Sequence, residues 1–166
     1  MSKSTVVVVA GVAGSGKSTL SAALVERLGW DFAEADMFHP AANIAKMTAG
    51  QPLNDDDRRP WLATLAAWID EHIAAGQPAI LTCSALTRAY RDVLRRTDVV
   101  FVQLTGPRDL LEQRITSRQG HFFVGTGMLD SQLATFEPLH SDEQGFVVSI
   151  DQPTYTQVET ILTHLP

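Results

Sequence analysis

The chain contains one cysteine, three lysines and no long apolar run among its 166 residues. The single cysteine, Cys83, excludes a disulfide within the chain and is typical of a reducing compartment. No segment is apolar over a bilayer-spanning length, and the first residues lack the pattern of a secretory signal peptide. We therefore expect a cytoplasmic protein with no membrane partner, and a Cys83 that is a small buried apolar side chain rather than a nucleophile.

Positive charge is also scarce. The chain has 13 lysines and arginines against 19 aspartates and glutamates, a net charge of −6. Proteins that bind nucleic acid need clustered positive charge, so we expect no nucleic-acid partner. No internal repeat, linker or low-complexity tract is present, and 45% of the residues are hydrophobic. This length and composition predict one globular domain over residues 1–166.

The strongest positive signal is a phosphate-binding loop of the G-x-x-x-x-G-K-S type. An apolar, β-branched run at residues 5–10 precedes it, and a helix-favouring stretch follows it. The glycines allow the backbone N–H groups to surround an anion, and the next helix adds the positive end of its dipole. A glycine-rich turn without a ligand is the alternative, but it explains neither the lysine nor the hydroxyl. We expect ATP to contact Gly11, Val12, Ala13, Gly14, Ser15, Gly16, Lys17, Ser18 and Thr19.

Two residues of this loop have predicted chemical roles. Lys17 can reach the outer phosphates and is a predicted catalytic residue, and the Ser18 hydroxyl is a predicted Mg²⁺ ligand. The other two lysines are Lys3 and Lys46. Because lysine is used so rarely in this chain, we expect Lys46 to have a specific role.

Strand-like and helix-like patterns alternate along the chain. Apolar runs predict strands at residues 5–10, 31–35, 79–83, 99–104 and 146–150. Helical patterns lie at 17–28, 41–49, 58–75, 87–95, 107–118 and 155–164. This alternation predicts an α/β fold, a P-loop NTPase with a parallel sheet covered by helices on both faces. Ligands of such sheets bind beyond the carboxyl ends of the strands.

The class of P-loop protein follows from what surrounds the loop. A GTPase needs an N-K-x-D and a D-x-x-G motif, and the third predicted strand instead ends Thr82-Cys83-Ser84. A small kinase needs only the loop, an acceptor site and arginines near the transferred phosphoryl group. We therefore favour a kinase, with a non-enzymatic nucleotide sensor as the alternative from another class.

Several side chains could form the acceptor site. Asp36, after the second predicted strand, can accept the proton of the acceptor hydroxyl; helix capping or an indirect contact with magnesium are its alternatives. His39 can donate a hydrogen bond to a polyol, or it can be a structural histidine. Asp57 is expected to hold Arg58 in a bidentate pair that points it at an anionic substrate group.

A mobile lid is predicted over residues 118–130. Arg114 and Arg118 lie four residues apart, on one face of a predicted helix that leads into a glycine-rich segment. We expect them to bind the phosphates of ATP as the lid closes, with Arg118 taking part in catalysis. Exposed helix surface is the alternative for both arginines.

The chain resembles the thermoresistant gluconokinase family over nearly its whole length. The resemblance is carried by Phe38-His39-Pro40, Asn43-Ile44-Ala45-Lys46-Met47, Pro52-Leu53-Asn54-Asp55-Asp56-Asp57-Arg58-Arg59-Pro60-Trp61-Leu62, Cys83-Ser84-Ala85-Leu86, Tyr90-Arg91-Asp92, Gly120-His121-Phe122-Phe123 and Asp151-Gln152-Pro153. Family members tend to have Asp-Gly-Asp where this chain has Glu34-Ala35-Asp36, and Val124-Gly125-Thr126-Gly127 looks about one residue longer than in many of them.

The resemblance implies an ATP:D-gluconate 6-phosphotransferase with a nucleoside-monophosphate-kinase-like fold, usually a homodimer. Arg58 and Arg91 would bind the carboxylate of gluconate, and Gln152 and Pro153 would frame the adenine. The other implied substrate-binding residues are Asp36, His39, Lys46 and His121. A kinase for another small anionic hydroxy compound, such as a shikimate-like acid or a nucleotide, is the alternative within enzymes.

Overall fold

The computed structural model describes residues 5–117 and 126–166. Five parallel strands form one sheet in the order β2-β3-β1-β4-β5. They are β1 (Val6–Ala10), β2 (Asp31–Glu34), β3 (Ala79–Cys83), β4 (Val99–Thr105) and β5 (Gly145–Ser149). The first strand is central: Val8 pairs with Leu81 of β3 on one side and with Phe101 of β4 on the other. The parallel α/β sheet predicted from the sequence is confirmed.

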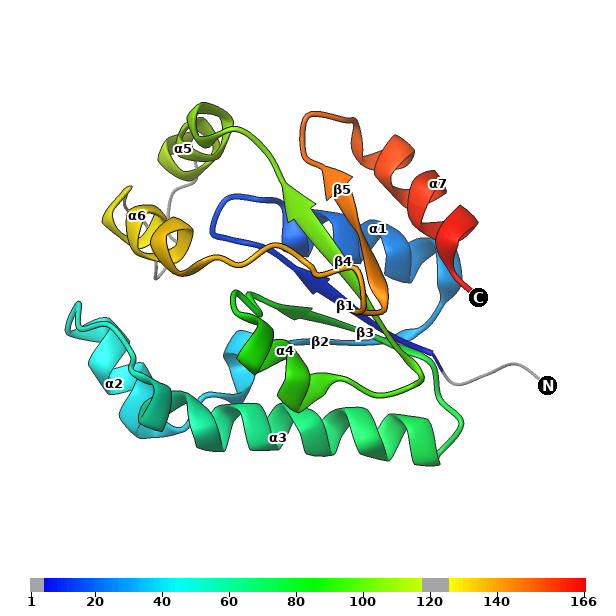
Figure 1. Ribbon diagram of the computed structural model, residues 1–166, viewed down its shortest axis with the longest axis horizontal. Helices are drawn as coiled ribbons and strands as arrows, with labels where there is room; N and C mark the ends of the chain where they lie inside the picture. The colour runs from blue at the N-terminus through cyan, green and yellow to red at the C-terminus, as the bar shows by residue number, and fades with distance from the viewer. Residues whose placement is uncertain (1–4, 118–125) are drawn as a thin grey trace.

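Helices cover both faces of the sheet (Figure 1). They are α1 (Lys17–Leu28), α2 (Ala41–Thr48), α3 (Asp55–Ala74), α4 (Arg88–Leu94), α5 (Arg108–Ser117), α6 (Thr126–Thr135) and α7 (Thr154–His164). Because side chains alternate along a strand, β1 contributes to two cores. Val7 packs in the cluster that contains residues of α1 and α7, and Val8 in the cluster of α3 and α4.

The start of α3 has a strong local cause. Asn54 caps the helix by accepting from the Asp57 backbone N–H, and Asp57 accepts from the Asn54 N–H, a reciprocal capping box. Aspartates 55–57 fill the first turn, where the helix dipole favours negative charge. The helix therefore begins at Asp55, three residues before the predicted start at Arg58.

Two elements were not predicted. β2 ends at Glu34 rather than Ala35, and a 3₁₀ turn, η1 (Ala35–Phe38), follows it. Helix α6 occupies Thr126–Thr135, so residues 126–130 of the predicted lid lie in a regular helix. Residues 118–125 of that lid lie outside the described residues.

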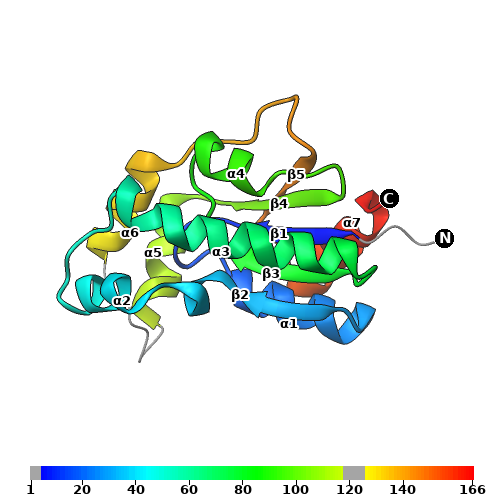
Figure 2. The same cartoon turned by 90° about the horizontal axis from the view of Figure 1, so that it is seen from below.

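The elements that carry the predicted site gather at one end of the sheet. Figures 1 and 2 both place α2, α5 and α6 at the end opposite to the C-terminus of the chain. The loop that follows β1 also lies at that end (Figure 1). Cys83, at the end of β3, is buried, and burial raises its pKa to about 12, as suits an apolar role. Within residues 5–117 and 126–166, no helix is both long and apolar enough to span a membrane.

Candidate active site

The phosphate-binding loop between β1 and α1 has the backbone geometry that its glycines predict. Gly14 and Gly16 have φ values of +80° and +91°, a left-handed region that strains other residues. A Cβ on Gly14 would lie 2.9 Å from the Leu111 carbonyl oxygen of α5. Lys17 bends back over the loop, and its Nζ donates to the carbonyls of Gly11 at 2.9 Å and Val12 at 3.1 Å. Its ammonium group therefore lies at the loop.

Two hydroxyls of the loop fit the chemistry of a bound nucleotide and its metal. Ser15 Oγ is buried and has no hydrogen-bond partner in the described part of the chain. Ser18 Oγ donates to Glu34 Oε1 at 2.8 Å, which places a carboxylate beside the predicted Mg²⁺ ligand. Mg²⁺ needs few protein oxygens because it keeps water and phosphate ligands. Among the described residues, no group of three or more metal-binding side chains occurs.

Glu34 was missed as a site residue by the sequence analysis. It is the last residue of β2, at the same sheet edge as the loop after β1. Its position at a strand end was the available signal, but the predicted strand continued to Ala35, so Asp36 was the first residue after that strand.

Asp36 and His39 lie together after β2. Asp36 is in η1 with a side chain that is 66% exposed, and His39 Nε2 is 4.0 Å from Asp36 Oδ1. The His39 ring is stacked on Trp61 of α3, with centroids 4.5 Å apart and an interplanar angle of 12°. Burial, the largest cause, lowers the pKa of His39; Arg58 also lowers it, and Asp36 opposes them. The pair thus combines an accessible carboxylate with a largely neutral imidazole.

Asp57 has a different partner from the one predicted. Lys46 Nζ of α2 lies 2.5 Å from Asp57 Oδ2, so this carboxylate pairs with Lys46 rather than with Arg58. The hydrogen bond from Lys46, helped by the Asn54 N–H, holds the pKa of Asp57 below its usual range. The reason is the capping box, which turns Asp57 back toward the helix start and toward α2.

Arg58 is oriented by Tyr90 of α4. Its Nη1 donates to the Tyr90 hydroxyl at 2.9 Å, and the Tyr90 hydroxyl donates to Asp55 Oδ1 at 2.5 Å. The guanidinium carbon lies 5.4 Å from the centroid of the Tyr90 ring. Tyr90 belongs to a segment that the resemblance quoted, but no role was predicted for it.

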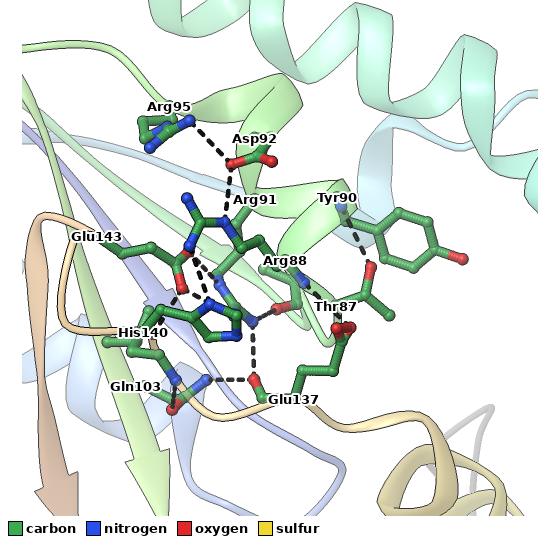
Figure 3. A network of polar contacts seen from close by, with 12 residues as sticks. Thr87, Arg88, Tyr90, Arg91, Asp92, Arg95, Gln103, Glu137, His140 and Glu143 are labelled. Atoms are coloured by element: carbon green, nitrogen blue, oxygen red, sulfur yellow. Dashed lines mark hydrogen bonds and ion pairs between the residues drawn. The ribbon is translucent and has the colours of Figure 1, made fainter.

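Arg91 does not face the site, contrary to expectation. Its side chain is fully buried, and its Nε and Nη2 donate to the Glu143 carboxylate at 2.7 and 3.0 Å. The remaining donors bind the carbonyls of Ala85, Leu86, Glu137 and Pro138. Figure 3 shows this network and the Tyr90 ring pointing away from it.

The partners of Arg91 give it a structural role. Burial opposes ionisation of Glu143, but the hydrogen bonds from Arg91 and from the His140 N–H outweigh it and keep the pKa of Glu143 below its ordinary value. The pair also holds the loop after β3, where Ala85 has a left-handed φ of 42°. Arg91 therefore has no donor directed at a substrate, and we exclude it from the candidate substrate site.

On the other side of the loop, Arg114 and Gln132 contact the nucleotide-binding region. Arg114 Nη2 donates to the Ile150 carbonyl at 2.7 Å, and a Cβ on Gly16 would lie 3.4 Å from Arg114 Nη1. Gln132 of α6, which was not predicted, accepts from the Ala13 N–H at 2.6 Å. Gln152 and Pro153 directly precede α7, and Gln152 Nε2 donates to Asp151 Oδ1 at 3.4 Å. Arg118 and His121 lie outside the described residues.

Comparison with known proteins gives consistent matches. The family model described as an AAA domain matches residues 6–139. The gluconokinase of Gluconobacter oxydans (strain 621H) is 45% identical over 159 residues, covering 95% of this chain and 89% of that protein. The thermoresistant gluconokinase of Escherichia coli (strain K12) is 42% identical over 149 residues, covering 88% and 85%.

Solved structures of kinases also match this chain. A sugar kinase from Janibacter sp. HTCC2649 matches with a TM-score of 0.90 at 48% identity, covering 96% of this chain and 93% of that one. A gluconokinase from Sinorhizobium meliloti 1021 matches with a TM-score of 0.85 at 39% identity, covering 99% and 93%. The APS kinase of Mycobacterium tuberculosis, 15% identical with a TM-score of 0.71, shares the fold. The family resemblance and the P-loop kinase fold are both confirmed: this chain belongs to the gluconokinase family.

Proposed function

We propose that this protein catalyses the ATP-dependent phosphorylation of D-gluconate to 6-phospho-D-gluconate. One observation carries the proposal: the phosphate-binding loop and the pair of Asp36 and His39 follow the carboxyl ends of parallel strands of one sheet, in a chain 45% identical to a gluconokinase. The side chains that we propose for substrate binding provide a guanidinium, a carboxylate, an imidazole and an ammonium group. They are those of Arg58, Asp36, His39 and Lys46. Gluconate has the complementary groups, a carboxylate and several hydroxyls.

ATP binds in this proposal to residues 11–19, with its phosphates against the backbone N–H groups of the loop. Lys17 stabilises the negative charge that develops on the transferred phosphoryl group. Ser18 Oγ would ligate Mg²⁺, and the Glu34 carboxylate, 2.8 Å from that hydroxyl, would help to hold the ion. When bound, the metal would neutralise negative charge on the phosphates. Arg114, Arg118, Gln152 and Pro153 complete the proposed ATP site.

Gluconate binds opposite the loop. Arg58 binds the carboxylate, and Lys46, His39 and His121 bind hydroxyls. Asp36 accepts the proton of the 6-hydroxyl as its oxygen bonds to the γ-phosphorus; the bond from that phosphorus to the bridging oxygen breaks, and ADP leaves. We further propose a homodimer in the cytoplasm, with residues 1–166 acting as one domain.

The test is an acceptor panel. The purified protein is given ATP, Mg²⁺ and, in turn, gluconate, glucose, shikimate or a nucleoside monophosphate, and acceptor-dependent ADP release is followed. We expect the highest kcat/KM with gluconate, and ³¹P NMR should show one product, phosphorylated at the 6-hydroxyl. Faster turnover of another acceptor would contradict the proposed substrate. Nucleotide binding without acceptor-dependent ADP release would instead support a nucleotide sensor.

A further inference from the structure

Asn43 of α2 is a buried polar residue to which the mechanism above gives no role. Only 3% of its surface is exposed, so its amide must find partners inside the protein. Its Nδ2 donates to the Asp57 carbonyl at 2.8 Å and lies 3.2 Å from His39 Nδ1. One amide nitrogen therefore joins the start of α3 to the histidine beside Asp36.

The chemistry of these partners fixes the orientation of the amide. A backbone carbonyl only accepts hydrogen bonds, so the group of Asn43 that faces Asp57 O must be the NH₂ group. An NH₂ group has two hydrogens and no acceptor capacity. The second hydrogen points to His39 Nδ1, which must then be the acceptor, and the proton of a neutral His39 ring is on Nε2.

The ring is also held in place. Trp61 stacks on one of its faces at 4.5 Å, and Trp61 is fixed in turn because its Nε1 donates to the Ala35 carbonyl at 2.7 Å. The charged groups that act on His39 are Asp36, on the preceding turn, and Arg58, on α3. Only 5% of the His39 side chain is exposed, and this burial favours the neutral ring.

We propose that Asn43 is a positioning residue that fixes His39 in the Nε2–H tautomer, so that this N–H is directed to the side of the ring where Asp36 lies. The Nε2 atom is 4.0 Å from Asp36 Oδ1, a gap in which a hydroxyl oxygen can contact both groups. That oxygen accepts a hydrogen bond from His39 Nε2–H and donates its own proton to Asp36.

The other tautomer would have the opposite effect. An unprotonated Nε2 would compete with Asp36 for the proton of the same hydroxyl, and it would direct that proton away from the base. The consequence for gluconate rests on the proposed function, whereas the tautomer itself does not.

The tautomer is tested by NMR on the whole wild-type protein. Long-range ¹H–¹⁵N spectra of protein labelled at histidine separate protonated from unprotonated ring nitrogens, and His39→Gln identifies the His39 signals. We expect an unprotonated Nδ1 and a protonated Nε2. A protonated Nδ1 would overturn the proposal whether or not gluconate is a substrate, and the measurement needs no variant of Asn43.

The positioning role is tested by a double-mutant cycle with Asn43→Asp and His39→Gln. The Asn43→Asp side chain offers no N–H to His39 Nδ1, so this variant should lower kcat/KM for gluconate by about tenfold. A glutamine at position 39 brings its own NH₂ donor and has no tautomer, so Asn43→Asp should change kcat/KM by less than about twofold in that background. Equal losses in both backgrounds would show a merely structural Asn43 and would overturn the positioning role.

A control on α2 separates helix stability from this effect. Thr48 is exposed and its hydroxyl donates to the Ile44 carbonyl within the same helix. Thr48→Ala should leave both the His39 spectrum and kcat/KM unchanged. If the His39 spectrum is as expected but gluconate is not phosphorylated, the proposed function fails and the tautomer assignment stands.

Discussion

Arg58 of α3 and Tyr90 of α4 are joined by a hydrogen bond of 2.9 Å although 32 residues separate them. The Tyr90 hydroxyl also donates a hydrogen bond to Asp55, which lies one helical turn before Arg58, so the phenol connects the two helices. In the part of the chain that the structure describes, Nη1 is the only nitrogen of the Arg58 side chain that donates a hydrogen bond to the protein. The guanidinium is therefore held in place while its other donors remain available to a carboxylate.

Replacement of Arg58 should weaken gluconate binding specifically. Arg58→Gln removes a charged donor, and we expect a loss of about 1.5–3 kcal/mol, seen as a KM for gluconate raised by roughly 10- to 100-fold. Arg59→Gln is the matched control, because Arg59 is exposed and pairs with the exposed carboxylate of Asp56 at 2.9 Å. The KM of Arg59→Gln for gluconate should stay at the wild-type value. An equal rise in the KM for ATP would mean that Arg58 serves the nucleotide or the fold.

Tyr90→Phe tests how far Arg58 depends on its orientation. The ring and its contact with the guanidinium remain, but the hydrogen bonds to Arg58 and Asp55 are lost. We expect a KM for gluconate raised about three- to tenfold with little change in kcat. Turnover of glucose, which lacks the carboxylate, should not change. A fall in kcat for both acceptors would contradict a role confined to Arg58.

Lys17→Met should impair the chemical step. The ammonium group offsets charge on the phosphates in the transition state, so kcat should fall by about 100-fold or more. Thermal unfolding should show a folded protein, because the loop is shaped by its glycine backbone and by its packing on α5. Near-wild-type turnover by the purified variant would be incompatible with the proposed role of the loop.

Asp36→Asn keeps the shape of the side chain but removes the base. We expect kcat to drop while the KM for gluconate changes little, since proton acceptance is needed only in the transition state. Glu34→Gln should behave differently, because Glu34 contacts Ser18: it should raise the Mg²⁺ concentration needed for half-maximal rate. A raised KM with unchanged kcat for Asp36→Asn would make Asp36 a binding residue only.

The buried pair of Arg91 and Glu143 should govern acid stability. Because the folded-state pKa of Glu143 is depressed from its ordinary value of 4.5, its contribution is present above pH 4.5 and is lost as the pH falls below it. Glu143→Gln leaves a buried charge unpaired and should lower the free energy of urea unfolding at pH 7 by about 3–5 kcal/mol.

The matched control for this pair is Asp142→Asn. Asp142 pairs with Arg88 at 2.6 Å but is 62% exposed, so its loss should lower the unfolding free energy much less than the loss of Glu143. The difference in unfolding free energy between wild type and Glu143→Gln should also shrink as the pH is lowered from 7 to 4. Similar losses for both variants would argue against a special role for the buried pair.

Local patterns explain why much of the fold was predictable. The central strand β1 is a continuous apolar run, and the glycines of the phosphate loop have a backbone role that can be recognised from their spacing. Helix α6 lacked such a signal, because Gly127 and the nearby glycines favoured a loop. The turn η1 was not predicted, and its first residue, Ala35, was placed at the end of the predicted strand.

The partners of charged side chains were the least predictable feature. Position after the second predicted strand suggested Asp36 and His39, which lie together in the structure, whereas the family resemblance suggested Arg91, which is buried elsewhere. The direction of the Arg91 side chain depends on Glu143, which is 52 residues away in sequence. No local sequence pattern can predict this pairing. Asp57 likewise pairs with Lys46 instead of the predicted Arg58, because the capping box of α3 orients its carboxylate toward α2.

The burial of Arg91 also constrains the order in which the chain can fold as it is synthesised. A guanidinium cannot leave water before its acceptors exist, and several of these lie in residues 137–143, far behind it in the chain. Until then the loop after β3 stays hydrated, and that loop includes the Ser84 carbonyl that accepts from the Gly11 N–H. We therefore expect the nucleotide-binding loop, although it is synthesised early, to be completed only after residues 137–143 have packed against Arg91.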